Sequence, residues 1–259
     1  MPQRKPAIDF ARVERHWCGG DVFMSNLLSA LSITFPEGER FFMDSVRQSS
    51  DALTDDVLRR EVSQFLAQEV MHGRLHEAFN DWVRSQGIET ADVERQARER
   101  LQRIRVGLSP EIQLAVTCAL EHFTAILAEY VFSHDDFREG MREPARSLWV
   151  WHAVEETEHK SVAFDVYQAS GGRYLIRAGT MLFTTFKYMR SVFGYQRAFM
   201  RQDPTRPGLW TYLRGFWTLF GSPGIFRSVI PAWLDYFRPG FHPWQRTPPK
   251  AFERLREEF

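Results

Sequence analysis

The sequence predicts an all-α protein: a four-helix bundle with a dinuclear metal site in its core, followed by additional aromatic helices. Two observations support this fold class. Several long stretches place apolar residues at steps of three and four, the period of a helix with one buried face. On four of these stretches the apolar row also carries glutamate or histidine. Burying such groups without partners costs several kcal/mol each, and a metal is the simplest shared partner.

Composition narrows the class of protein. The chain has 259 residues, 44% of them hydrophobic, which suffices for one sizeable core. Its two cysteines, Cys18 and Cys118, lie far apart, which argues against a disulfide framework and fits a reducing compartment. The N-terminus lacks the continuous apolar run of a secretory signal. No uncharged apolar run reaches about 18 residues. We therefore predict no transmembrane span and a cytoplasmic location, with a peripheral position at the inner face of the membrane left open.

The net charge is zero but unevenly distributed. Residues 173–246 hold 11 Lys and Arg against 2 Asp and Glu, together with 18 of the 37 aromatic residues. Residues 1–172 carry the balancing negative excess. We therefore divide the chain into an N-terminal arm and metal-binding helical core over 1–172, and a basic aromatic helical extension over 173–259. We expect the two parts to pack together as one structural domain.

The first helical stretch is predicted over residues 21–48. Pro36 interrupts it, and either kinks one helix or starts a second. Glu37 and Glu39 follow directly. Because two phenylalanines come just after Glu39, we expect Glu39 to point into the core and keep Glu37 as the alternative.

The second helix is predicted over residues 54–87. Its inward row mixes apolar and metal-capable residues at steps of three and four: Val62, Phe65, Glu69, His72, His76, Phe79 and Val83. The Glu69-x-x-His72 pair places a carboxylate and an imidazole one turn apart on one side of the helix. We expect His76 to support a ligand or line a pocket. The polar stretch 90–106 is predicted to be a connecting helix.

Two further helices complete the bundle. One is predicted from a Ser-Pro-Glu start at 109–111 to about residue 132, with Glu121 in its buried row. The other is predicted over 144–172 and carries Glu156-x-x-His159, the second pair of this kind.

Three polar residues near this second pair have open roles. Glu155 can replace Glu156 as a ligand or orient a ligating histidine. His152 lies on the same face one turn earlier. Asp165 is expected to hold a ligating histidine.

As a set, these residues predict a metal centre. One Glu-x-x-His arises by chance in roughly half of such chains. Two such pairs alternating with single glutamates, Glu39 and Glu121, form the pattern of carboxylate-bridged dinuclear sites in ferritin-like bundles. The alternative is a set of buried salt bridges, which explains the matched spacing less well. Oxygen and imidazole donors suit two iron ions, with manganese or zinc also compatible.

Four segments resemble a known family: FPEGERFF, QEVMHGRLH, ALEHFTA and WHAVEETEHKSVAFDVY. They are similar to the bacterial "predicted metal-dependent hydrolase" family. The ligand order is also similar to that of the p-aminobenzoate N-oxygenase family of diiron proteins. That second resemblance implies an extra histidine ligand four residues before the last Glu, and His152 stands there. It would make His152 a seventh ligand.

From the donor set we predict a diiron oxygenase or oxidase that acts on an apolar or amphiphilic small molecule with the help of an electron donor. The first alternative is a metal-dependent hydrolase that activates water at a dinuclear site. The sequence holds no GxSxG and no HExxH motif, which weakens that alternative. The second alternative is a non-enzymatic iron-binding or metal-binding protein.

The basic aromatic extension has three open uses. Its helices can lie at a membrane interface, pair with the acidic core, or form a homodimer contact. We expect no nucleic-acid binding, because no recognised binding motif accompanies the charge.

Overall fold

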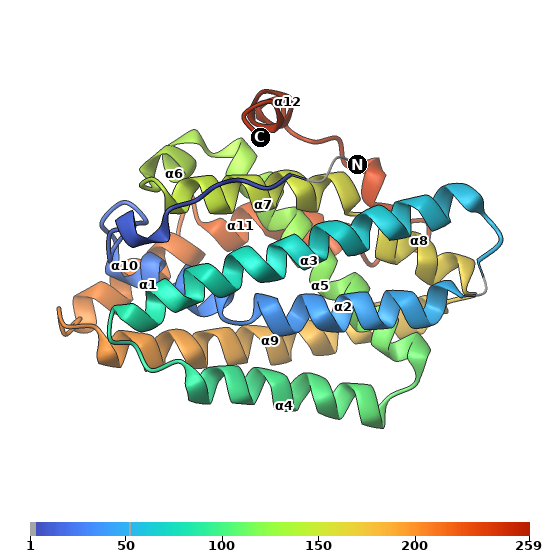
Figure 1. Cartoon of the computed structure of the whole chain (residues 1–259), viewed down its shortest axis with the longest axis horizontal. Coiled ribbons are helices and arrows are strands. Elements are labelled where there is room, and N and C mark those ends of the chain that lie inside the picture. Colours follow the sequence, from blue (N-terminus) through green and yellow to red (C-terminus); the bar gives the residue numbers. More distant parts are fainter. Residues whose placement is uncertain (1–3, 52) are drawn as a thin grey trace.

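The computed structural model describes residues 4–51 and 53–259 (Figure 1). Across these residues the chain is helical and forms no β-strand, apart from one isolated bridge between Cys18 and Met141. The predicted all-α class is therefore confirmed. The α-helices, in order, are α1 (Val22–Ser32), α2 (Phe35–Ser50), α3 (Asp56–Ser85), α4 (Ala91–Gly107), α5 (Pro110–Ser133), α6 (Asp135–Gly140), α7 (Ala145–His159), α8 (Val162–Ala169), α9 (Tyr174–Gln202), α10 (Leu209–Phe220), α11 (Ile225–Asp235) and α12 (Ala251–Arg256).

Helices α2, α3, α5 and α7 form the bundle that carries the Glu and His motifs. Helix α2 packs along α3, and α5 packs along α7. Contacts between α2 and α5 and between α3 and α7 join the two pairs. In Figure 1, α2 and α3 lie side by side along the long axis of the molecule. Every member of the inward row predicted for the second helix is buried in α3.

The helix starts follow local sequence signals. Asp55 caps α3, with its carboxylate accepting a hydrogen bond from the backbone N–H of Val57. Ser109 caps α5, and Pro110 occupies its first position. Pro36 lies in the first turn of α2, after α1 has ended. Of the two alternatives for Pro36, the structure therefore takes the one in which a second helix begins.

The last predicted bundle helix is not continuous. Helix α7 ends at His159 and α8 begins at Val162, whereas the sequence predicted one helix to about residue 171. At the break, Nζ of Lys160 donates to the backbone oxygen of Arg246 at 2.7 Å. The stretch contains neither Gly nor Pro to mark this end, so no local signal in the sequence predicts the break.

Helix α5 is the central helix of the fold. It packs against α2, α7, α8, α9 and α11. Among the described helices it alone is long and apolar enough to cross a membrane by length and composition, and 67% of its apolar window is buried inside the structure. Such burial is that of a core helix, whose apolar sides face neighbouring helices.

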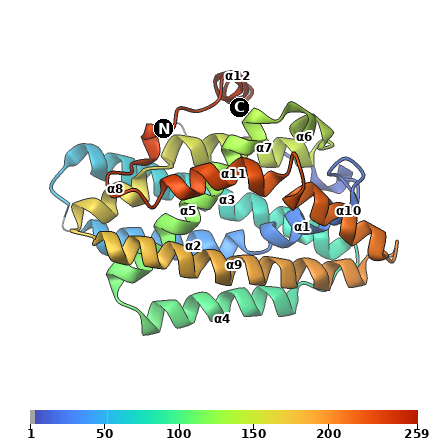
Figure 2. The same ribbon diagram turned by 180° about the vertical axis from the view of Figure 1, so that it is seen from behind.

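The extension covers the side of α5 away from α3. Helices α9 and α11 pack on α5, and α10 joins α11 at one end (Figure 2). Charge pairing with the acidic core is only partial: Arg173 pairs with Glu111 at 2.7 Å and Arg246 with Glu129 at 2.5 Å. Several large apolar residues of these helices are exposed, among them Phe186, Trp210 and Trp217. Membrane or dimer contact at this surface stays a prediction.

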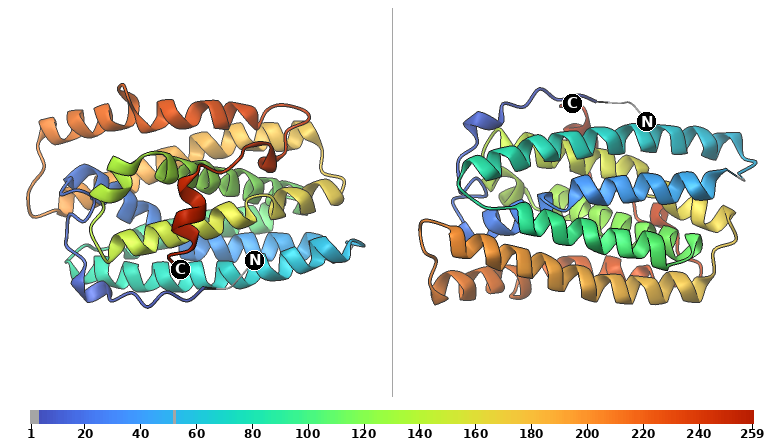
Figure 3. Two further views of the ribbon diagram at one scale, coloured as in Figure 1. Left: turned by 90° about the horizontal axis from the view of Figure 1, so that it is seen from above. Right: turned by 60° about the horizontal axis from the view of Figure 1, so that its bottom comes forward.

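The two ends of the described chain meet on the outside of the bundle (Figure 3). The Arg4 guanidinium donates to both carboxylate oxygens of Glu158, at 2.7 and 2.8 Å. Nε of Arg256 lies 2.9 Å from the same carboxylate. Glu158 thus fastens both ends to α7, next to the metal motif.

Candidate metal centre

The four bundle helices bring the predicted donors into one buried cluster. Glu39 comes from α2, Glu69 and His72 from α3, Glu121 from α5, and His152, Glu156 and His159 from α7. All seven are 5% exposed or less. We call these seven residues the Glu/His cluster.

Two groups within the cluster have the spacing of metal sites. One ligand atom from each of Glu69, His72, Glu156 and His159 lies within 4.8 Å of the others. The same holds for Glu39, His72 and His152. Glu121 joins through His159, whose Nδ1 lies 3.3 Å from Oε2 of Glu121. The two groups share His72, so their donors form one continuous cluster.

His72 has a defined inner and outer side. Its Nδ1 faces the cluster, 3.7 Å from Glu69 and 3.4 Å from Glu156. Its Nε2 lies 3.1 Å from Glu155. The carboxylate of Glu155 is held in turn by the backbone N–H of Arg4 at 3.3 Å. Glu155 therefore lies behind His72 and orients it, while Glu156 faces the cluster.

His152 is oriented by a chain of buried polar groups. Its Nε2 lies 2.9 Å from Oε1 of Glu156, and its Nδ1 lies 2.7 Å from Nε2 of His76. Nδ1 of His76 lies 2.8 Å from the hydroxyl of Ser32, which donates to the side-chain oxygen of Asn80. His76 therefore contacts His152 from outside the cluster, and its support of a metal ligand stays a prediction.

Many donor atoms of the cluster lack a hydrogen-bond partner among the described residues. They are Oε2 of Glu39, both carboxylate oxygens of Glu69 and of Glu121, Oε2 of Glu156, Nδ1 of His72 and both ring nitrogens of His159. Buried polar groups are hydrogen-bonded in nearly all proteins, so this concentration needs an explanation. Oxygen and imidazole donors aimed at one another across 3 to 4 Å fit bound divalent metals. The residues present therefore fit the group that the pattern predicts.

The pKa shifts of the cluster carboxylates also fit a site for divalent metals. Burial, together with the charge of Glu121, raises the pKa of Glu69 well above its usual range. Burial and the nearby Glu156 raise the pKa of Glu121 to about 7. Burial by itself would raise the pKa of Glu156. The nearby imidazoles of His159, His152 and His72 lower it by more, so the pKa of Glu156 lies well below the usual range. Without cations the cluster therefore retains protons that metal binding would release.

Two apolar cavities open onto the cluster. The larger, of about 760 Å³, lies between α2, α4, α5 and α9, and the smaller, of about 320 Å³, lies between α1, α5, α9 and α11. His152 and Glu156 line both cavities, and Glu39 lines the larger one. A small molecule in either cavity would therefore contact the cluster directly.

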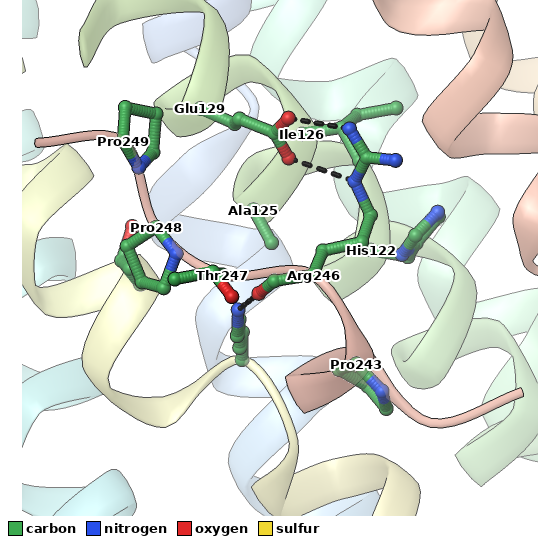
Figure 4. A pocket seen from close by; sticks show the side chains of 11 residues that line it. His122, Ala125, Ile126, Glu129, Pro243, Arg246, Thr247, Pro248 and Pro249 are labelled. Carbon is green, nitrogen blue, oxygen red and sulfur yellow. Dashed lines mark hydrogen bonds and ion pairs between the residues drawn. The ribbon is translucent and has the colours of Figure 1, made fainter.

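A separate hollow on the outer side of α5 has a different character (Figure 4). Glu129 and Arg246 form its ion pair, with Nε of Arg246 donating at 2.9 Å. Pro248 and Pro249 line one side of the hollow and Pro243 lies on the other side (Figure 4), and no residue of the Glu/His cluster lines it. Its volume of about 20 Å³ holds no more than a water molecule.

Two predicted residues lie outside the cluster. Glu37 is held by Arg98 at 2.8 Å and Arg40 at 3.0 Å on the outer side of α2. Asp165 contacts no cluster histidine: it accepts from Ser161 at 2.7 Å and pairs with His242 at 2.9 Å. The expectation for Asp165 was wrong: Asp165 lies on α8, beyond the break that ends α7 at His159.

Sequence reasoning missed two supporting residues. Arg4 holds Glu155 from the N-terminal arm, which carries no motif. Gly73 lets α2 approach α3, since a Cβ there would lie 3.2 Å from Oε2 of Glu39. A glycine inside a helix costs about 1 kcal/mol of stability relative to alanine. Its presence within the predicted helix was therefore the one feature of the sequence that indicated a close approach of another segment.

Fold and site together define an all-helical protein with a buried Glu/His cluster able to hold a dinuclear metal site. The model of one family, described as predicted metal-dependent hydrolase, matches residues 2–247. The chain belongs to this family, as the sequence segments indicated. No curated protein and no solved structure matches the chain. The resemblance to the p-aminobenzoate N-oxygenase family stays a prediction.

Proposed function

We propose that this chain is an enzyme that acts on an apolar or amphiphilic small molecule at a dinuclear metal centre. One observation carries the proposal: a buried set of unpartnered donors lies at the end of a large apolar cavity. The residues that would hold the metals are Glu39, Glu69, His72, Glu121, Glu156 and His159, with His152 as a seventh donor. A protein that only stores metal has no need of such a cavity beside the site.

Hydrolysis is the first candidate reaction, supported by the description of the family. When bound, a pair of divalent metals supplies Lewis acidity and lowers the pKa of water, and a pair of irons also supplies a site for reducing dioxygen. The chain supplies the surroundings. The apolar walls exclude bulk water, and Glu155 fixes the ring of His72. Burial lowers the pKa of His152 to about 4, so its ring stays neutral at the cavity wall and is free to ligate a metal.

Oxidation by dioxygen is the second candidate, supported by the donor set and the enclosure. Four carboxylates against two or three imidazoles favour iron or manganese over zinc. At the inner end of the cavity, Glu39, His152 and Glu156 line its wall, and Tyr188 lines the same cavity.

Metal content and reactivity separate these candidates. Protein from cells grown with iron, manganese and zinc would be assayed for metals per chain. It would then be tested with an ester and amide panel of graded chain length. The iron form would be reduced without oxygen, mixed with dioxygen, and followed by visible absorption and oxygen consumption.

The outcomes exclude one another. Hydrolysis by the manganese or zinc form, lost in Glu69→Ala, supports the first candidate. Oxygen consumption by the iron form, without hydrolysis by any form, supports the second. A chain that takes up no metal in any form overturns the proposal itself.

A further inference from the structure

The rim of the larger cavity carries positive charges that pair with no carboxylate of the described residues. Arg100 and Arg103 on α4 and Lys187 and Arg190 on α9 line this rim. Among the described residues, none of the four lies within 4.0 Å of a carboxylate in an ion pair. Arg103, Lys187 and Arg190 are exposed, and Arg100 is half-buried.

The other arginines of α4 behave differently. Arg95 pairs with Asp92 at 2.7 Å, Arg98 with Glu37 at 2.8 Å, and Arg105 with Asp44 at 2.8 Å. Along one helix, the arginines that line the cavity are therefore the unpaired ones. Arg100 is nevertheless held in place, since it donates to the hydroxyl of Ser191 and lies over the ring of Tyr195.

The cavity changes character from its rim to its inner end. The middle is walled by aliphatic and aromatic side chains, among them Leu101, Ile104, Val116, Leu120 and Ile176. The inner end reaches Glu39, His152 and Glu156. No aspartate or glutamate other than these cluster carboxylates lines this cavity within the described chain.

We propose that the ligand of this cavity is a single-chain amphiphile with an anionic head group. The head pairs with the cations of the rim, and the apolar chain extends inward toward the cluster. Arginine provides several donors in a fixed fork that suits carboxylate or phosphate, and the volume of about 760 Å³ lies in the range of small-molecule sites. Reaction of the chain at the cluster rests on the proposed function, whereas binding needs no metal.

The test is binding of matched ligands to the full chain by calorimetry. Dodecanoate, dodecanol and dodecyltrimethylammonium share one chain length and differ in head charge. We expect dodecanoate to bind at least about tenfold more tightly than dodecanol, equivalent to 1.4 kcal/mol. We expect the cationic ligand to bind most weakly. The preference for dodecanoate should shrink at high salt, because salt screens charges at the exposed rim.

Variants locate the head group. The double variant Arg100→Gln, Arg190→Gln should weaken dodecanoate at least about tenfold and leave dodecanol unchanged, since each removed charge contributes only to the anion. The matched control is Arg98→Gln, on the same helix but paired with Glu37 and outside the cavity. The control should bind dodecanoate as the parent does.

A second variant locates the chain. Gly179 lines the cavity, and a Cβ added there meets no atom within 4 Å. Gly179 is exposed, so Gly179→Phe places a ring at the outer edge of the cavity lining and should weaken dodecanoate and dodecanol alike, with circular dichroism and melting temperature confirming the fold.

Three binding results would overturn the inference. Equal affinity for dodecanoate and dodecanol would show that the cations of the rim do not bind the head group. Unchanged dodecanoate affinity in the double variant Arg100→Gln, Arg190→Gln would show the same. If the chain binds anionic vesicles but not monomeric dodecanoate, the cations of the rim contact a membrane surface rather than the head group of a ligand in the cavity. Metal content is measured on the same samples. Absence of metal with intact dodecanoate binding would reject the proposed function and leave this inference standing.

Discussion

Replacing Glu121 by glutamine should change stability with opposite sign in metal-free and metal-loaded protein. In the metal-free chain, four buried carboxylates face one another: Glu39, Glu69, Glu121 and Glu156. Only two histidines of the cluster, His72 and His159, have a raised pKa. Glu121→Gln removes one of these carboxylates and therefore reduces the repulsion among the remaining negative charges. In the metal-loaded chain the same change removes a donor.

The magnitude follows from the pKa of Glu121, raised by burial and by Glu156 from 4.5 to about 7. A carboxyl with a raised pKa in the folded state holds its proton more tightly there than in the unfolded chain. Folding stability therefore falls as pH rises from about 4.5 to 7, and one pKa unit corresponds to about 1.4 kcal/mol. The loss is about 3 kcal/mol above pH 7. Glutamine does not ionise, so Glu121→Gln should recover up to about that amount at pH 8 and almost nothing at pH 4.

The assay is urea unfolding of the chelated protein at pH 4, 6 and 8, repeated after metal loading. A gain of about 3 kcal/mol corresponds to about 6 °C or more in melting temperature for a chain of this size. The matched control is Glu129→Gln, also on α5 but paired with Arg246 outside the cluster. It should cost about 1 kcal/mol or less, with the same sign in both metal states.

The competing account treats the cluster as buried salt bridges. In that account Glu121 compensates the charge of His159, whose Nδ1 lies 3.3 Å away. Removing one partner of a buried pair destabilises by about 3 to 5 kcal/mol. Destabilisation of the chelated protein at pH 8 by Glu121→Gln would therefore refute the metal-centre reasoning.

Four further predictions test other parts of the structure. Metal at 100 times its dissociation constant should add about 2.7 kcal/mol per site, and chelation should lower the melting temperature by about 5 °C or more per site. Glu39→Gln should reduce metal content per chain, whereas Glu37→Gln, which loses only the pairing with Arg98 and Arg40, should keep it. Asp165→Asn should also keep metal content and cost about 1 kcal/mol or less, since only contacts to Ser161 and His242 change. If the exposed aromatic residues of α9–α11 meet a membrane, the chain should co-sediment with anionic vesicles, less so at high salt; no sedimentation at low salt would remove that prediction.

Helical periodicity predicted the bundle well because its signal is local. The row of α3 alternates at steps of three and four over six turns, and such a row fixes both the helix and its buried face. The same spacing placed Glu69 and His72, and later Glu156 and His159, on inward faces. For each of these residues, the periodicity of its own helix is enough to predict that its side chain is buried.

Other features depend on contacts between distant segments and were open in the sequence. Glu155 and Glu156 are adjacent and equally acidic. The structure separates their roles through Arg4, about 150 residues earlier. The end of α7 at His159 is likewise accompanied by a contact between distant segments, in which Lys160 donates to the backbone oxygen of Arg246. No local pattern carries that information, so the position of Asp165 was out of reach.

The meeting of both ends at Glu158 has a consequence for biosynthesis. All donors of the Glu/His cluster have been synthesised once residue 159 is in place, but Arg256 follows almost 100 residues later. Until α12 forms, Glu158 lacks that partner, and the arm that holds Glu155 behind His72 is fastened at fewer points. A nascent chain can therefore assemble the bundle early, while the outer support of the site closes late.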